Sequence, residues 1–441
     1  MEDAFIIRGG KKLHGTVTLS GAKNVALKAV IAALLFDGPV VLKNIPRIGD
    51  IDELLHLIRI LGAYAEFTGV NTVSIDGRNL QENKLDFLHA SKIRASFLLF
   101  APLLYKLKHA FIPNPGGCRI GARPIDRIVS GMKSLGIAVS YQTETGYYEA
   151  RMVGKPEGSF TFKKPSHTGT ELMIMLSVFC KGTVVIRNCA LEPEIDDLIS
   201  FLNEGGGKIV RKENDIFIEG VSSLRQKQSF SIVSDRNEAI TYAILGIITH
   251  GDVTVFSIPD YYIGTFVDFV RKMGAGAEKT KQGGWRFYYK RSLKPIDIVT
   301  GTHPGFMTDW QPNMAVLLTQ ANGMSFIHER VFENRFSYVD ELVKVGAKID
   351  LVKPEIENAA AFYLFNYDQT KEYLQAIRVY GPQRLHSGVM KISDLRAGAT
   401  LAIAALVAEG ESVINGASIL ERGYENFIEK VRGLGGDIQR A

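Results

Sequence analysis

The sequence has few cysteines and no long uninterrupted apolar run. Its three cysteines are odd in number and lack the spacing of metal ligands, which argues against a disulfide framework and against a cysteine zinc site: Cys118, Cys180 and Cys189. The most apolar stretch, residues 25–42, contains two charged residues, a glycine and a proline, so it cannot cross a bilayer as a helix. The first residues show no basic segment followed by an apolar one, as a secretory signal would. We therefore expect a soluble, cytoplasmic protein that does not contact membranes.

The sequence also lacks a strong excess of either charge. Its 52 basic and 47 acidic residues leave a net charge of +5 over 441 residues, which is too small to indicate a nucleic-acid partner. The apolar share of 46% and the charged share of 22% are ordinary for a globular protein. A chain of this length exceeds one ordinary hydrophobic core, so it predicts two or three domains.

One pattern recurs along the chain. An apolar helix rich in Ala and Leu is followed by a turn, a short β-branched strand and a second, amphipathic helix that ends at a glycine. Six glycines occupy that last place: Gly62, Gly136, Gly206, Gly274, Gly346 and Gly435. Glycine suits the end of a helix because it adopts the left-handed conformation without strain. The spacing predicts six units of roughly 70 residues, with an insertion, Lys353 to Gln375, at the edge of a unit in the longer last interval.

Alternating segments within these units predict strands. The clearest are TVSIDG, YYEARMVG, DIFIEG and WRFYYKR, in which apolar side chains recur at every second position. Six α/β units grouped three and three would give two similar domains with a cleft between them. A solenoid is the alternative, but solenoid repeats are usually about 20 to 50 residues long.

Cationic residues cluster at the expected helix starts. Lys23 and Asn24 in LSGAKN come just before the first apolar helix, where free backbone N–H groups favour an anion. Five arginines have similar places: Arg94, Arg123, Arg335, Arg396 and Arg422. A single arginine is usually exposed or in a salt bridge, but the set together predicts one polyanionic ligand.

Two further segments carry candidate chemistry. Residues 113–126, PNPGGCRIGARPID, are too rich in Pro and Gly for a helix or strand. Cys118 is therefore expected on an exposed loop, where Arg119 and Arg123 would lower the pKa of its thiol, whereas Cys180 and Cys189 are expected to be small buried residues. In GTHPGFMTDWQPN, Asp309 either caps the helix that follows or acts as a base toward a hydroxyl.

Taken in order, these motifs resemble a known family. LSGAKN, IRAS, PGGCRIGARPID, EPEI, DRNE, THPGF, FENRF, DLRAG and RGYE are similar to the UDP-N-acetylglucosamine 1-carboxyvinyltransferases. These enolpyruvyl transferases are related to the 5-enolpyruvylshikimate-3-phosphate synthases, which share the fold but not the PGGC loop. The resemblance implies an α/β fold of two inverted, barrel-like domains built from six βαβαββ units. The expected domains are residues 22–232, with the Cys118 lid loop, and residues 1–21 with 233–441, and the active site is expected in the cleft between them.

The resemblance also implies roles for particular residues. Cys118 resembles the general acid, and Asp309 would assist loss of the proton from the sugar 3-hydroxyl. Lys23 and Asn24 look like phosphoenolpyruvate contacts, Arg123 and Arg422 like its phosphate ligands, and Arg335 and Arg396 like further cations, with Arg94 near the substrates. The stretches similar to those that hold the sugar nucleotide comprise Arg123, Pro124, Ile125, Asp126, Arg127, Lys164, Pro165, Ser166 and His167, with Val331 near the sugar.

The implied reaction joins phosphoenolpyruvate and UDP-N-acetylglucosamine. The sugar hydroxyl adds to C2 of phosphoenolpyruvate, and elimination of phosphate then leaves an enolpyruvyl ether, the first committed step of peptidoglycan synthesis. No metal or organic cofactor is expected, and Cys118 places the chain with members that fosfomycin inactivates. The chain departs from the family's pattern at His167, Thr168 and Leu172. Two alternatives therefore stay open: a paralogue acting on another UDP-amino sugar, and a sugar-nucleotide-binding regulator without turnover.

Overall fold

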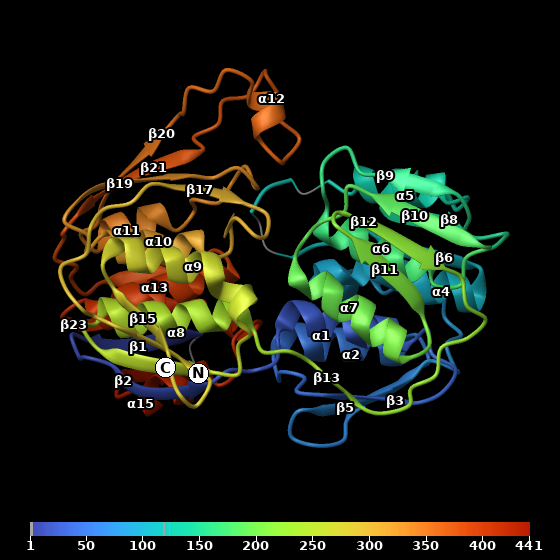
Figure 1. Ribbon diagram of the computed structural model, residues 1–441, viewed down its shortest axis with the longest axis horizontal. Helices are drawn as coiled ribbons and strands as arrows, with labels where there is room; N and C mark the ends of the chain where they lie inside the picture. The colour runs from blue at the N-terminus through green and yellow to red at the C-terminus, as the bar shows by residue number, and fades with distance from the viewer. Residues whose placement is uncertain (1–2, 118–119, 123) are drawn as a thin grey trace. The chain divides into compact units, whose positions relative to one another are not determined.

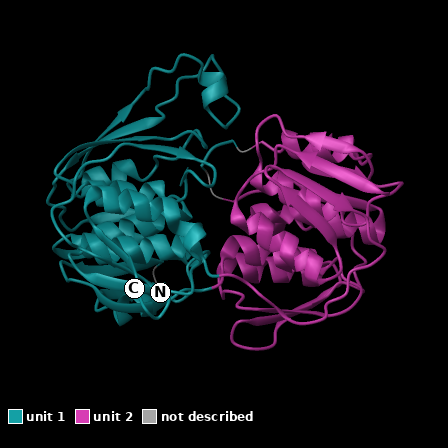
Figure 2. Ribbon diagram, in the orientation of Figure 1, with its two compact units in different colours: residues 1–20, 118–123, 234–441 teal, residues 21–117, 124–233 magenta. Residues whose placement is uncertain are grey.

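The computed structural model describes residues 3–117, 120–122 and 124–441, and these divide into two compact units (Figure 2). The unit that we call C-terminal contains the described residues of 1–20, 118–123 and 234–441, and the N-terminal unit contains those of 21–117 and 124–233. The chain thus passes from one unit to the other after Ser20 and after Val233. Residues 120–122, expected in the N-terminal domain, group with the C-terminal unit.

The described strands of the N-terminal unit form three sheets (Figure 1). The first sheet has, in spatial order, the strands β13 (Phe230–Ser231), β3 (Val40–Lys43), β5 (Thr72–Asp76) and β4 (Tyr64–Phe67). The second has β6 (His109–Pro113), β8 (Tyr147–Arg151) and β7 (Ala138–Gln142). The third has β11 (Lys208–Lys212), β12 (Asp215–Glu219), β10 (Thr183–Arg187) and β9 (Ser159–Thr161). The first and third sheets each add a parallel edge strand, β13 or β9, to antiparallel strands. In the second sheet only a parallel bridge between Lys84 and Phe111 occupies that edge among the described residues, which agrees with the less regular second repeat.

The described strands of the C-terminal unit likewise form three sheets. The fourth sheet has, in spatial order, the strands β15 (Gly276–Lys279), β16 (Trp285–Tyr288), β14 (Asp252–Phe256) and β2 (His14–Thr18). The fifth has β18 (Phe306–Met307), β17 (Ile298–Gly301), β19 (Gly323–His328), β21 (Ala376–Gly381) and β20 (Lys348–Val352). The sixth has β22 (Val389–Lys391), β23 (Gly410–Asn415), β1 (Ala4–Gly9) and β24 (Asp437–Arg440). The strand β1 lies antiparallel between β23 and β24, and β2 pairs in parallel with β14. Strands from the start of the chain, β1 and β2, therefore belong to two sheets whose other strands come from the C-terminal half of the chain.

Buried helices fill the interior of each unit (Figure 1). They are α1 (Lys23–Ala33), η1 (Arg94–Leu99) with α4 (Phe100–Leu107), α6 (His167–Ser177), α8 (Arg236–Ile248), α10 (Gln311–Leu318) and α13 (Leu395–Val407). Every residue of α8 and α10 is buried. In the C-terminal unit α8, α10 and α13 pack against one another, and in the N-terminal unit α4 packs against α1 and α6.

A second set of helices has one exposed face. It comprises α2 (Gly49–Ile60), α5 (Asp126–Ser134), α7 (Pro193–Glu204), α9 (Asp260–Met273), α11 (Val339–Lys344) and α15 (Phe427–Gly433), and the short helices are α3 (Phe87–Ala90), α12 (Ala359–Phe362) and α14 (Ala417–Glu421). The six glycines of the repeat follow this second set, all with φ between +82° and +104°. Those values lie in the left-handed region, so the reason given for glycine at this position is confirmed.

The insertion Lys353–Gln375 does not lie at the edge of a unit. It connects β20 to β21, which pair with each other in the fifth sheet, and carries α12 away from the helices of that unit (Figure 1). Two of its side chains, Tyr363 and Phe365, are only 3% and 6% exposed. The expectation of an edge insertion was therefore wrong, because the extra residues lengthen a β-hairpin and pack against their own sheet.

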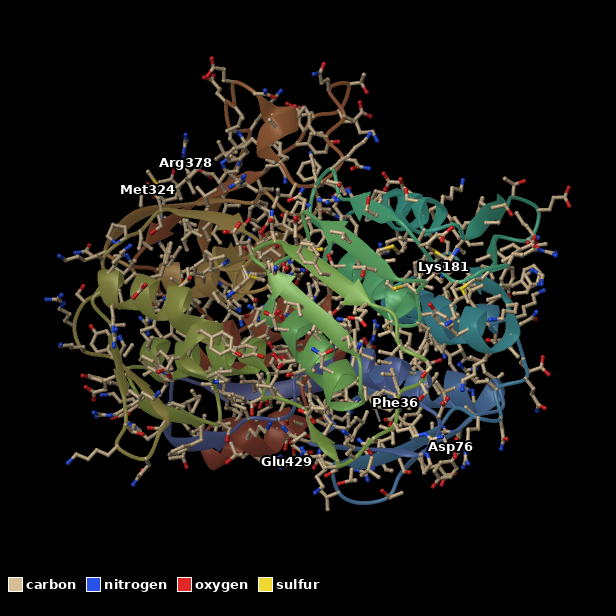
Figure 3. The ribbon with its side chains drawn as sticks, turned by 45° about the vertical axis from the view of Figure 1, so that its right-hand side comes forward. Phe36, Asp76, Lys181, Met324, Arg378 and Glu429 are labelled. Carbon is tan, nitrogen blue, oxygen red and sulfur yellow. The ribbon has the colours of Figure 1, made fainter. Side chains whose placement is uncertain are left out.

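Labelled side chains illustrate the inside and outside of the fold (Figure 3). In the N-terminal unit Phe36 is buried and stacks on Phe201 with ring centroids 5.0 Å apart. In the C-terminal unit Met324 on β19 and Arg378 on β21 point outward from the sheet (Figure 3). Within the described residues, no helix combines the length and the apolar character that crossing a bilayer would require.

Candidate functional site

Asp309 lies between two buried arginines of the C-terminal unit. Arg335 Nη2 donates to Asp309 Oδ1 at 2.7 Å, and Arg396 Nε donates to Asp309 Oδ2 at 3.2 Å. The Asp309 side chain is 27% exposed, whereas those of Arg335 and Arg396 are 2% and 6% exposed. The structure thus brings three predicted site residues together. The cap alternative for Asp309 is wrong, because the N-cap of α10 is Trp310 and makes no side-chain cap.

The two arginines keep the Asp309 carboxylate ionised. Burial acts to raise the pKa of Asp309, but the charges of Arg396 and Arg335 outweigh it and hold the pKa at about 2. Burial acts to lower the pKa of Arg396, but the combined attraction of Asp309, Tyr424 and Asp235 outweighs it and raises the pKa. Asp309 is therefore an anion at every physiological pH.

Asp394 and Tyr424 orient Arg396. Asp394 caps α13, and its Oδ1 accepts hydrogen bonds from the backbone N–H groups of Arg396 at 2.9 Å and Ala397 at 3.2 Å. Arg396 Nη1 donates to the Tyr424 hydroxyl at 3.4 Å, and Arg422 lies two residues before that tyrosine, directly after α14. The sequence argument noted the arginine of DLRAG and passed over Asp394, although an aspartate before an apolar helix is a recognisable cap.

Glu329 ties the turn that carries Val331 to the segment before Asp309. Its Oε1 accepts hydrogen bonds from the Val331 N–H at 2.6 Å and the Phe332 N–H at 3.1 Å, and its Oε2 accepts one from the Thr308 hydroxyl at 2.9 Å. Glu329 is fully buried, and burial raises its pKa. The sequence argument missed this glutamate because its side-chain partner, Thr308, is 21 positions away and is brought near only by tertiary folding.

The inserted segment supports the same turn. Gln375, at its end, donates from Nε2 to the carbonyl oxygens of Glu329 at 3.1 Å and Phe332 at 3.0 Å. Arg330 donates to the carbonyl oxygen of Phe362 at 3.0 Å. Removing the whole segment would therefore take away contacts beside Val331.

Residues 120–122 form hydrogen bonds with Glu333 and Asn334, which follow the turn that carries Val331. The Ala122 N–H donates to Glu333 Oε1 at 2.8 Å, and the Asn334 N–H donates to the Ile120 carbonyl at 3.3 Å. The predicted residues Cys118 and Arg123 lie outside the described residues, so the roles assigned to them stay predictions.

In the N-terminal unit, Lys23 starts the first buried helix. The helix α1 begins at Lys23 itself, with Asn24 next, so both belong to its first turn rather than preceding it. Lys23 Nζ lies 2.6 Å from Asp50 Oδ2 of α2, with side chains 11% and 8% exposed. Gly21, two residues before Lys23, lies close against the backbone of Asn44, where a Cβ on residue 21 would lie 1.7 Å from the Asn44 carbonyl oxygen. A largely buried ion pair thus lies at the start of α1, where the helix dipole favours an anion.

The predicted nucleotide-binding stretches adjoin each other in the same unit. Arg127 Nη1 donates to the Pro165 carbonyl at 3.4 Å, and α5 packs against α6. Burial lowers the pKa of Lys164, and the neighbouring charge of Arg127 lowers it further. Two cations thus lie close together, an arrangement that an anionic ligand stabilises.

The other predicted residues frame these cations. Ser166 caps α6 by accepting a hydrogen bond from the Gly169 N–H at 3.2 Å, and His167 is the first residue of that helix. On the other stretch, Pro124 is exposed, Ile125 is buried and Asp126 starts α5. The partly exposed Arg94 begins η1.

The two described cysteines are buried. Cys180 and Cys189 are 3% and 1% exposed. Burial raises the pKa of both thiols, that of Cys189 to about 12. The prediction that they are small core residues is confirmed, and neither is a reactive thiolate.

Comparison with known proteins identifies the family. The family model described as EPSP synthase (3-phosphoshikimate 1-carboxyvinyltransferase) matches residues 7–431. The chain belongs to the EPSP synthase family. Within that family it is similar to two proteins named UDP-N-acetylglucosamine 1-carboxyvinyltransferase. The one from Acidobacterium capsulatum is 37% identical, covering 99% of this chain and 96% of that protein. The one from Bartonella henselae is 35% identical, covering 99% of each.

Two solved structures have the same fold. The enolpyruvyl transferase NikO from Streptomyces tendae superposes with a TM-score of 0.85 at 21% identity, covering 100% of this chain and 99% of that one. An EPSP synthase from Acinetobacter baumannii gives a TM-score of 0.72 at 18% identity, covering 99% and 100%. These likenesses confirm the predicted enolpyruvyl transferase fold.

Proposed function

We infer that this protein transfers the enolpyruvyl group of phosphoenolpyruvate to the 3-hydroxyl of UDP-N-acetylglucosamine and releases phosphate. The observation that carries this inference is the Asp309 carboxylate between Arg335 and Arg396, in a chain 37% identical to a protein named for that activity. Such a transferase supplies the first committed step of peptidoglycan synthesis.

The C-terminal unit supplies the charges needed for the addition step. Asp309 accepts a hydrogen bond from the attacking hydroxyl and helps to remove its proton, while Arg335 and Arg396 turn toward the phosphate and carboxylate of phosphoenolpyruvate. Fixed cations stabilise the negative charge as phosphate leaves, without reorganisation during the reaction. Arg422 and Arg123 complete the phosphate ligands in this proposal, and Cys118 is the acid that protonates the methylene carbon.

The N-terminal unit supplies anion-binding groups. Lys23 and Asn24, in the first turn of α1, bind phosphoenolpyruvate, since a helix N-terminus and an ammonium group both favour a phosphate. Arg127 and Lys164 face the same ligand, the diphosphate of the sugar nucleotide, which neutralises the repulsion between them.

The decisive experiment measures phosphate release from phosphoenolpyruvate in the presence of UDP-N-acetylglucosamine, with mass spectrometry of the product. We expect stoichiometric phosphate and an enolpyruvyl ether of the sugar nucleotide. Binding of both substrates without phosphate release would contradict the proposal and favour a regulator without turnover.

Fosfomycin provides an independent test of the proposed acid. An epoxide adduct is expected on Cys118 alone, because Cys180 and Cys189 are buried with raised thiol pKa values. Peptide mapping that finds the adduct on either buried cysteine would contradict the role of Cys118.

A second candidate substrate is another UDP-amino sugar. The first turn of α6 carries His167 and Thr168, both partly exposed, where the resembling family has smaller residues. Leu172, the third departure, is fully buried and belongs to the core. Competition between UDP-N-acetylglucosamine and other UDP-sugars separates the two candidates.

A further inference from the structure

A buried charge cluster lies behind the proposed nucleotide-binding stretch of the N-terminal unit. Lys28 of α1 and His167 of α6 converge on one oxygen of Glu171, with Lys28 Nζ 3.3 Å and His167 Nε2 3.1 Å from Glu171 Oε1. Glu192, which precedes α7, acts on the same histidine electrostatically. Lys28, Glu171 and Glu192 were absent from the residues predicted from sequence.

The cluster needs the charge of His167 to be balanced. Glu171 is 0% exposed, Glu192 5% and Lys28 7%, and among the groups that act on His167 two are buried carboxylates and one is a buried ammonium group. An uncompensated charge in a protein interior is strongly unfavourable. A protonated imidazole at His167 supplies the missing positive charge.

The electrostatic surroundings of His167 favour that protonated form. Burial acts to lower the pKa of His167, and Lys28 also lowers it. The attraction of Glu171, supported by Glu192, outweighs both and raises the pKa above its ordinary value. The cluster therefore favours the protonated form of His167 more than water favours that of an ordinary histidine.

His167 also reaches the surface at the proposed ligand site. Its side chain is 25% exposed, whereas that of Glu171 four residues later is fully buried, so the imidazole connects the interior cluster to the first turn of α6. The residues just before it include Lys164 and Pro165, whose carbonyl oxygen is the acceptor of Arg127. His167 thus begins the helix that directly follows the stretch carrying Lys164 and Pro165.

We propose that His167 is a positioning residue whose positive charge strengthens binding of the sugar-nucleotide diphosphate, so that UDP-N-acetylglucosamine binds more tightly to the protonated protein. The inference rests on the proposed function. The cluster of Lys28, Glu171 and Glu192 fixes the imidazole from behind, and the ligand completes the charge balance in front. Neutral His167 would leave the diphosphate with Arg127 and Lys164 alone.

The test is calorimetric titration with UDP-N-acetylglucosamine from about pH 5.5 to 8.5, on either side of the ordinary histidine pKa of about 6.5. The wild type is compared with His167→Gln and with His109→Gln. His109 is a matched control, because it is also 25% exposed and pairs with a glutamate, its Nε2 being 2.8 Å from Glu149 Oε1.

We expect the affinity of the wild type to fall about tenfold as pH rises, the low end for a charge-assisted contact that is partly exposed. His167→Gln should bind weakly with a flat pH profile, matching the wild type only at high pH, while His109→Gln should follow the wild type. If the affinity of His167→Gln showed the same pH dependence as that of the wild type, the proposal would be overturned.

Histidine side-chain NMR adds a readout that a purely structural role would not produce. The His167 resonance is the one missing from His167→Gln, and its titration midpoint should lie above the ordinary value and shift downward in Glu171→Gln. A midpoint at or below the ordinary value in the wild type would refute the charge assignment. If the wild type binds no UDP-N-acetylglucosamine at any pH, the proposed function fails, and this midpoint still decides the charge of His167.

Discussion

The two units each hold a carboxylate among cations, but they do so differently. In the C-terminal unit both oxygens of Asp309 accept hydrogen bonds from arginines, and Asp394 and Tyr424 hold Arg396 in turn. In the N-terminal unit Lys28 and His167 approach a single oxygen of Glu171, and neither oxygen of Glu171 has a hydrogen-bond partner among the described residues. Arginine stays charged at any physiological pH, whereas histidine does not. The first cluster is therefore a fixed charge array, and the second depends on a proton.

This difference corresponds to the chemistry proposed for each unit. Stabilising a phosphate as it leaves requires charges that do not change during the reaction, which arginines supply. Binding a sugar nucleotide requires only an equilibrium affinity, which can depend on a proton without impairing the chemical step.

The largest expected effect comes from Asp309→Asn. Turnover should fall by about 100-fold to 1,000-fold, because the amide cannot take the proton of the hydroxyl, while the affinity for UDP-N-acetylglucosamine should change little. The matched variant Glu171→Gln should retain turnover at saturating sugar nucleotide. Steady-state kinetics with both substrates varied checks the pair, and equal losses of turnover would erase the distinction between the clusters.

Lys28→Met tests whether the N-terminal cluster is balanced as described. The variant leaves two buried carboxylates with one histidine, and we expect it to lower the free energy of unfolding by about 3 kcal/mol. The double variant Lys28→Met with Glu171→Gln should recover most of that loss in urea denaturation. Arg384→Gln, which removes an ion pair with Glu409 whose side chains are 84% and 72% exposed, should leave stability unchanged.

Tyr424→Phe tests the support of the C-terminal cluster. The hydroxyl lies 2.8 Å from Thr241 Oγ1 and accepts a hydrogen bond from Arg396, so its removal should cost about 1 kcal/mol of stability. Turnover should fall only a few-fold, because Asp309 still holds Arg396. A loss as large as that of Asp309→Asn would show that the tyrosine acts on substrate directly.

The smallest effect is the pH dependence of stability due to His167. A histidine with a raised pKa in the folded protein contributes stability that is complete below its unfolded pKa of about 6.5 and is lost as pH rises through the folded pKa. The free energy of unfolding of wild type relative to His167→Gln should therefore decline above about pH 6.5.

For Asp309, with a pKa lowered from 3.8 to about 2, the contribution to stability is present above the unfolded pKa and is lost as pH falls toward the folded pKa. Denaturation at several pH values checks both directions.

Much of the fold follows from local sequence. The six repeat glycines have positive φ, because ending a helix in the left-handed conformation is a local requirement that glycine meets. The alternating segments are the strands β5, β8, β12 and β16, and the apolar helices are buried. The position of the insertion was wrong, because counting residues between glycines locates extra length but not the strands on either side of it.

The sequence by itself determined the six-unit α/β repeat, the burial of Cys180 and Cys189, and the charged residues whose motifs resemble an enolpyruvyl transferase. Only the tertiary structure decided their partners: Asp309 with Arg335 and Arg396, Lys23 with Asp50, Glu329 with Thr308, and Glu171 with Lys28. The partners in these pairs are far apart in the sequence. Thr308 and Glu329 are 21 positions apart, and Lys28 and Glu171 are 143 positions apart. Helix ends and strand alternation depend on neighbouring residues, whereas the partner of a buried charge depends on which distant elements the packed helices bring together.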